Sequence, residues 1–116
     1  MRHAKGVKKL GKATDQRIAM LRSIVRSLFT RGKVKITVTR GKEAEKLAER
    51  VIELAKNGDL HSRRMATSMI LDEGVVSKVF SEAKARFSQR AGGYTRLTRV
   101  GFRLGDAAPM AVLEII

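Results

Sequence analysis

The sequence predicts an α+β domain in which helices cover a small mixed sheet in two layers, preceded by a basic N-terminal arm. Three observations lead to this prediction. Apolar residues recur with helical spacing in some segments, alternate or cluster as in strands in others, and glycine or aspartate marks the boundaries. With 116 residues, 43% apolar content and no cysteine, residues 1–116 can form one domain around one core without disulfides. The predicted order is helix, strand, three helices, two strands.

The first 13 residues are predicted to be an extended basic arm, and residues 14–116 the globular body. The arm has five lysines and arginines, no acidic residue and no apolar periodicity. Because such a segment cannot form a core of its own, we expect it to become ordered only when it binds a partner.

The first helix of the body is predicted to begin at Thr14 or Asp15, either of which is a good N-cap, and to end before Gly32. Its apolar residues follow helical spacing, and its other face carries arginines. The apolar positions are Ile18, Leu21, Ile24, Val25, Leu28 and Phe29.

A half-buried strand is predicted over residues 33–39, because apolar and polar residues alternate strictly there. Val34, Ile36 and Val38 would face the core. Lys33 and Lys35 would give the strand a basic outer face.

Three helices are predicted next, over residues 42–56, 59–71 and 72–87. An apolar stripe indicates the helix over residues 42–56, and Asn57-Gly58 ends it. Aspartates at the start of the other two are suitable N-caps. We expect the acidic ladder of the first of these three, Glu45, Glu49 and Glu53, to face solvent.

Two paired strands are predicted at the C-terminal end, over residues 94–102 and 110–116, which are rich in β-formers. The turn between them contains Gly105, Asp106 and the only proline, Pro109. Because residues 110–116 are apolar on both faces, this segment is expected to be a central strand.

The positive charge of the chain is concentrated at its two ends. Residues 1–40 carry a net charge of +11, residues 41–85 carry none, and residues 86–116 carry +3, within a total of +14. A neutral body that presents basic surfaces indicates a polyanionic partner, and nucleic acid is the first candidate.

Basic residues in the arm, the first helix, the first strand and the last hairpin are therefore the candidate binding residues. Lysines and arginines would neutralise phosphates, and Tyr94, the only tyrosine, could stack on a base or sugar. The candidates are Arg2, His3, Lys5, Lys8, Lys9, Lys12, Arg17, Arg22, Lys33, Lys35, Tyr94, Arg96, Arg99 and Arg103.

No catalytic residue, cofactor or metal site is predicted. Residues 6–13 match three of the four fixed positions of a phosphate-binding loop, but Ala13 stands where a hydroxyl would bind Mg²⁺. His3 and His61 are far apart in the sequence and have no cysteine partners. Since no acid, base and nucleophile form a coherent set, we expect a binding protein and not an enzyme.

Two other kinds of binding protein would share this charge. A DNA-binding or nucleoid-type protein remains the alternative. A membrane-surface protein using residues 15–31 is disfavoured, because one small domain needs the apolar stripe of that helix for its core.

Seven blocks spread over the chain carry a family resemblance. They are Met1–His3, Lys9–Gly11, Met20–Arg22, Ser27–Phe29, Leu54–Arg64, Gly92–Arg96 and Gly105–Ala111. Together they resemble the family of the seventeenth protein of the bacterial large ribosomal subunit, and the blocks at 54–64 and 92–96 are the most specific.

This resemblance implies a non-enzymatic, cytoplasmic constituent of the large ribosomal subunit that supports ribosome assembly and translation. It implies binding to large-subunit ribosomal RNA, with the arm inserted among RNA helices and the body near the rim of the peptide exit tunnel, beside neighbouring ribosomal proteins. It also implies an α+β fold with the order given above, and no small-molecule substrate or membrane as a partner.

Overall fold

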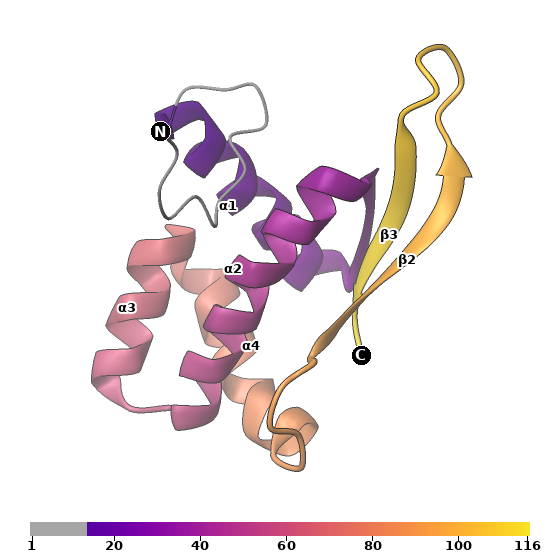
Figure 1. The fold of residues 1–116 in the computed structure, drawn as a ribbon. Helices are drawn as coiled ribbons and strands as arrows, with labels where there is room; N and C mark the ends of the chain where they lie inside the picture. Colours follow the sequence, from indigo (N-terminus) through magenta and orange to yellow (C-terminus); the bar gives the residue numbers. More distant parts are fainter. Residues whose placement is uncertain (1–13) are drawn as a thin grey trace, which may run out of the picture.

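Helix α2 (Val38–Asn57) lies at the centre of the molecule and contacts every other helix and strand. In the computed structural model, which describes residues 14–116, α2 and α1 (Thr14–Arg31) lie against a three-stranded sheet. Helices α3 (Leu60–Ile70) and α4 (Glu73–Phe87) pack against α2 (Figure 1). The α+β class and the predicted element order are confirmed.

The sheet consists of β1 (Lys33–Thr37), β2 (Thr95–Phe102) and β3 (Pro109–Ile115) in the order β1-β3-β2. Strand β3 is central, as its two apolar faces predicted. Both of its neighbours run antiparallel to it, so the prediction of a mixed sheet is wrong in this respect. Strands β1 and β2 therefore form opposite edges of the sheet, and the β2–β3 hairpin projects beyond the helices (Figure 1).

The boundary between β1 and α2 differs from the predicted one. The strand ends at Thr37 and the helix begins at Val38, four residues earlier than expected. Val38 continues the apolar alternation of the strand in the sequence, but in the structure it is the buried first residue of α2. The first turn of α2 lies close to the sheet, since a Cβ on Gly41 would be 2.7 Å from a terminal carbon of Leu97.

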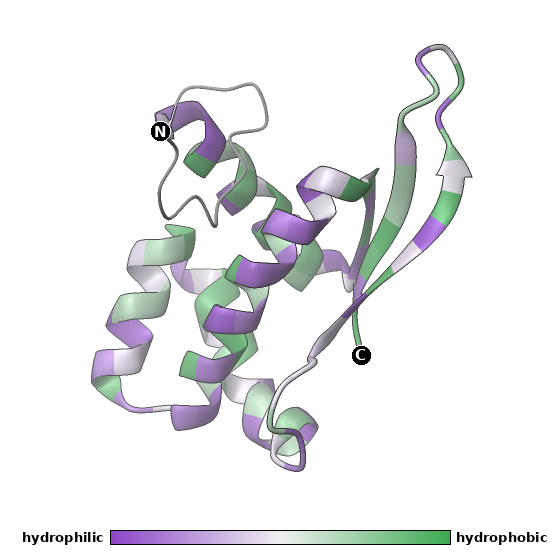
Figure 2. Ribbon diagram, viewed as in Figure 1, coloured by the Kyte–Doolittle hydropathy of each residue, from purple (hydrophilic) through white to green (hydrophobic). Residues whose placement is uncertain are grey.

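The core lies between α2 and the elements around it, and the inward faces of the helices are apolar (Figure 2). Val25 and Leu28 of α1, Ile52 of α2 and Leu113 of β3 are fully buried. Alanines of α2 let the neighbouring helices approach closely. This interdigitated interior positions the sheet and the four helices relative to one another.

The predicted helix ends are confirmed at three positions. Asp59 accepts a hydrogen bond from the Ser62 N–H at 2.8 Å and so caps α3. Asp72 accepts one from the Val75 N–H at 3.1 Å and caps α4. Gly58 ends α2 in the left-handed region, with φ 72°, and its N–H donates to the Leu54 carbonyl.

The left-handed conformation of Gly58 predicts that replacing this glycine destabilises the protein. We expect Gly58→Ala to lower the free energy of unfolding by about 1–2 kcal/mol, because an L-residue is strained there. The matched control is Gly92→Ala, since a Cβ at Gly92 meets no atom within 4 Å and its φ is not positive. Urea denaturation measures both variants, and equal midpoints would contradict the prediction.

Candidate nucleic-acid interface

The lysines of the edge strand β1 are exposed, as the predicted basic outer face requires. Lys33 and Lys35 line a hollow of about 330 Å³ between α1 and β1, together with Ser23, Ser27 and Arg31. The side chains of Arg31, Lys33 and Lys35 make no hydrogen bond or ion pair with residues 14–116. Three unneutralised cations and two hydroxyls thus surround one open groove.

This positive surface continues past β1 to the start of α2. Arg40 and Lys42 are exposed there, also without a partner among residues 14–116. Arg31, Lys33, Lys35, Arg40 and Lys42 are called the basic edge below. Arg31, Arg40 and Lys42 were not among the predicted site residues, although the absence of acids between positions 16 and 42 was a signal that could have identified them.

Two other predicted residues are free of intramolecular partners in the described part of the chain. Arg17 is half-buried on α1, and Arg99 is exposed on β2. Because β2 is the edge opposite to β1, Arg99 lies away from the strand that carries Lys33 and Lys35. The structure therefore does not gather all the predicted cations on one surface.

Arg22 has a structural role that the sequence did not reveal. Its Nε donates to the Met69 carbonyl at 2.9 Å, and its Nη2 donates to the Ser68 carbonyl at 3.3 Å. Arg26 similarly donates to the Ile70 carbonyl at 2.7 Å. These arginines of α1 satisfy the last carbonyls of α3 and place positive charge at the negative end of that helix.

Arg96 and Arg103 each bind a carboxylate within the hairpin. Arg96 pairs with Glu114 at 2.8 Å across the sheet, and its side chain remains 61% exposed. Arg103 pairs with Asp106 at 2.6 Å through two parallel hydrogen bonds. The hydrogen bond from Arg103, followed by that from the Ala108 N–H, lowers the pKa of Asp106 to about 2. Both ion pairs are open to solvent, so their positive charge is partly offset but accessible.

Tyr94 belongs to the core, which corrects the prediction that its ring stacks on a base or sugar. The residue is 0% exposed, and its ring packs edge-on against Phe87 with a centroid distance of 5.2 Å. Its hydroxyl donates to Glu53 and accepts from Lys56 Nζ at 2.8 Å. Burial, then the hydrogen bond to Glu53, raises the pKa of Tyr94.

The acidic ladder of α2 also departs from its predicted solvated role. Glu49 accepts hydrogen bonds from the main-chain N–H groups of Tyr94 at 3.2 Å and Thr95 at 3.1 Å. The Thr95 hydroxyl lies 3.0 Å from Glu45 and 2.9 Å from Glu49. These carboxylates therefore hold the start of β2 against α2.

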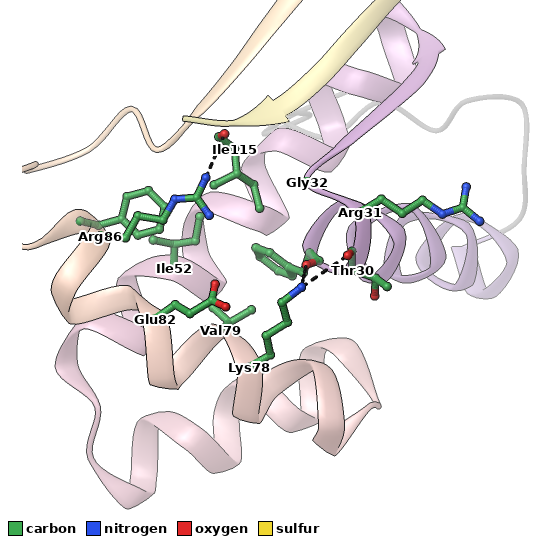
Figure 3. A pocket seen from close by; sticks show the side chains of 11 residues that line it. Thr30, Arg31, Gly32, Ile52, Lys78, Val79, Glu82, Arg86 and Ile115 are labelled. Carbon is green, nitrogen blue, oxygen red and sulfur yellow. Dashed lines mark hydrogen bonds between the residues drawn. The ribbon is translucent and has the colours of Figure 1, made fainter.

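A second hollow, of about 260 Å³, lies where α1, α4 and the end of β3 meet (Figure 3). Its two inward cations are already engaged. Lys78 Nζ donates to the Phe29 and Thr30 carbonyls at the end of α1, and Arg86 donates to the main-chain oxygens of Ile115 and Ile116. Arg31 points away from this hollow (Figure 3). The hollow is a seam between elements whose cations stabilise the fold.

The predicted arm residues lie outside the described part of the chain. They are Arg2, His3, Lys5, Lys8, Lys9 and Lys12. Over residues 14–116, no helix is long and apolar enough to cross a membrane, and no three histidines or acids are grouped to hold a metal ion.

Comparison with known proteins identifies the family. Residues 20–116 match the family model described as ribosomal protein L17. The chain belongs to the ribosomal protein L17 family. The resemblance read from the seven sequence blocks is thereby confirmed, and membership confirms a structural ribosomal protein rather than an enzyme.

Curated relatives match along almost their whole length. The large ribosomal subunit protein bL17 of Clostridium acetobutylicum is 50% identical over 113 residues, which cover 97% of this chain and 99% of the relative. That of Desulforapulum autotrophicum is 47% identical over 116 residues, which cover 100% and 97%. That of Moorella thermoacetica is 50% identical over 109 residues, which cover 94% and 97%.

The burial of Tyr94 predicts how the stability of the protein changes at alkaline pH. Its pKa is raised above the ordinary value of about 10, so the folded state holds the phenolic proton more tightly than the unfolded state does. The resulting stabilisation is complete below pH 10 and is lost as the pH rises from 10 through the folded-state pKa.

Urea denaturation at pH 8 to 11 should show a steeper alkaline loss of stability for the wild type than for Tyr94→Phe. At pH 8 the variant should be less stable by about 1–2 kcal/mol, because Glu53 and Lys56 lose a partner. As the chain has one tyrosine, absorbance of the ionised phenol reports its titration directly. A phenolic pKa of 10 in the folded protein would contradict the assignment.

Proposed function

We propose that this chain, as a large-subunit ribosomal protein, binds large-subunit ribosomal RNA through the basic edge and the N-terminal arm. One observation supports this proposal most directly. The five cations of the basic edge are exposed and have no carboxylate or carbonyl partner among residues 14–116, whereas Arg22, Arg26 and Lys78 are used inside the fold. Only the former are available to neutralise phosphates.

The shape of the basic edge suits a sugar-phosphate chain. Lys33 and Lys35 are two positions apart on a strand, which separates them by about 6.6 Å along one face. Ser23 and Ser27 lie on the other side of the groove and can donate to phosphate or ribose oxygens. Such contacts would position the protein on RNA without reading base sequence.

We propose that other cations extend the RNA-binding surface beyond the basic edge. The arm contributes its sequence-predicted residues, and Arg17 and Arg99 add free charges. Arg96 and Arg103 are exposed enough to exchange a carboxylate for a phosphate oxygen. The arm residues are Arg2, His3, Lys5, Lys8, Lys9 and Lys12.

Three finer statements rest on the family resemblance. They are the position near the rim of the exit tunnel, the contacts with neighbouring ribosomal proteins, and a cytoplasmic location. The relatives are named as proteins of the large ribosomal subunit, which favours RNA over DNA as the polyanion. A preference for duplex DNA over structured RNA at equal salt would support the alternative instead.

The basic edge can be tested by the salt dependence of RNA binding. With about 8 phosphate contacts, the slope of log affinity against log salt should be about −6 to −7 for the wild type. The double variant Lys33→Gln/Lys35→Gln should reduce the magnitude of that slope by about 1–2, because two contacts are lost. Filter binding to a large-subunit ribosomal RNA transcript measures both.

The matched control for this experiment is Arg64→Gln/Lys84→Gln. These residues are exposed cations on α3 and α4, outside the basic edge, and the double substitution removes the same amount of charge. The proposal requires the control to keep a slope closer to that of the wild type. Equal losses in the two variants would show that net charge alone, and not the basic edge, determines binding.

The arm can be tested by deletion of residues 2–13. We expect incorporation into large subunits to fall while the urea unfolding midpoint changes little, because the described core lies within residues 14–116. Sedimentation of cell lysate through a high-salt sucrose gradient measures incorporation. Unchanged incorporation of the shortened chain would exclude a major role for the arm.

A further inference from the structure

The end of the β2–β3 hairpin carries the most exposed apolar residues in the described part of the chain. Phe102 is 75% exposed and Leu104 97%, and Val100 beside them is 49% exposed. Other exposed apolar side chains, such as Leu60 at the start of α3 and Leu71 just after its end, occur singly. Here three exposed apolar residues lie within five positions, and a concentration of exposed apolar surface typically marks an interaction site. The side chains of Val100, Phe102 and Leu104 are called the apolar tip below.

The backbone at the apolar tip is held in one shape by several hydrogen bonds. The Arg103 N–H donates to the Ala108 carbonyl at 2.8 Å, and the Ala107 N–H donates to the Arg103 carbonyl at 2.9 Å. Asp106 binds the guanidinium of Arg103 and accepts from the Ala108 N–H. A turn with this many internal bonds loses little further conformational freedom on binding.

The hairpin holds the apolar tip away from the body of the protein. It projects beyond the helices (Figure 1), and apolar segments alternate with polar ones along β2 and the turn (Figure 2). The sheet order places β2 at the edge opposite β1. Lys33 and Lys35 can therefore lie on RNA while the apolar tip reaches a different partner.

Charge and chemistry at the apolar tip favour a protein as that partner. Arg103 pairs with Asp106 and Arg96 with Glu114, so Arg99 is the one arginine of β2 and its turn without a partner in the described residues. The aliphatic side chains of Leu104 and Val100 gain little from phosphates, but fill apolar pockets well. An aromatic residue with a nearby arginine is typical of the anchors of protein interfaces.

We propose that the apolar tip inserts into an apolar pocket of another protein of the large subunit. The inference rests on the proposed function, because it requires that the chain be part of the subunit. The chain would then connect RNA at one edge of its sheet with a protein at the other.

The test uses the full chain with Phe102→Ser/Leu104→Ser, and Leu60→Ser as the control, since Leu60 is a similarly exposed leucine on the body. Affinity for protein-free large-subunit ribosomal RNA should stay within about twofold of the wild type, because the phosphate contacts are intact. Retention on large subunits during a high-salt wash should fall roughly tenfold for the apolar-tip variant and little for the control.

A photo-reactive benzoylphenylalanine at position 104, and separately at 102, then identifies what the apolar tip touches in purified large subunits. The inference expects both positions to cross-link to the same ribosomal protein. Cross-links to RNA, cross-links to a second copy of this chain, or weaker binding of the variant to protein-free RNA would each overturn it, as would unchanged retention. Absence of the wild-type chain from the subunit would instead refute the proposed function, and this inference with it.

Discussion

The attachment of α2 to the start of β2 determines where the hairpin lies relative to the helices. Glu49 accepts two consecutive main-chain N–H groups, those of Tyr94 and Thr95, at the point where the chain enters the sheet. Next to this carboxylate, the Tyr94 ring fills the core against Phe87 while its hydroxyl is held by α2. Because apolar burial and charge-assisted hydrogen bonds act on the same two residues, the direction in which β2 leaves the body is strongly constrained.

This attachment separates the two surfaces of the protein that remain available to partners. With β2 held on one side, β3 pairs along it and β1 pairs along β3, so the lysines of β1 and the strand β2 lie at opposite edges of one sheet. The β-bulge between Arg99 and Gly101 lies just beyond the part of β2 that packs on α2. Past that point Arg103, Ala108 and Pro109 line a hollow together with Thr39 and Arg40 of α2. The side chains of Val100, Phe102 and Leu104 remain exposed.

Local signals in the sequence predicted the elements well, whereas the roles of polar side chains depended on the tertiary structure. Asp59 and Asp72 cap helices within three residues of themselves, so the sequence alone was sufficient to identify them. Tyr94 and Arg22 bind partners more than 35 positions away, and no local pattern reports such pairs. Glu49 is likewise more than 35 positions from Tyr94 and Thr95 in the sequence. Its helical spacing therefore predicted a solvent-exposed carboxylate, whereas in the fold the carboxylate accepts hydrogen bonds from the N–H groups of these two residues.

The fold also explains how a chain with a net charge of +14 can be well packed although few ion pairs form among residues 14–116. Arg22 and Arg26 donate to the last carbonyls of α3, and Lys78 donates to those of α1. Each cation thereby stabilises the negative end of a helix without a carboxylate. Since these internal cations need no acids, the chain can remain poor in acidic residues, and neither lysine of β1 is engaged in an ion pair among residues 14–116. Some of the excess positive charge in the sequence therefore stabilises helix ends inside the fold, and the rest is exposed on the proposed binding surface.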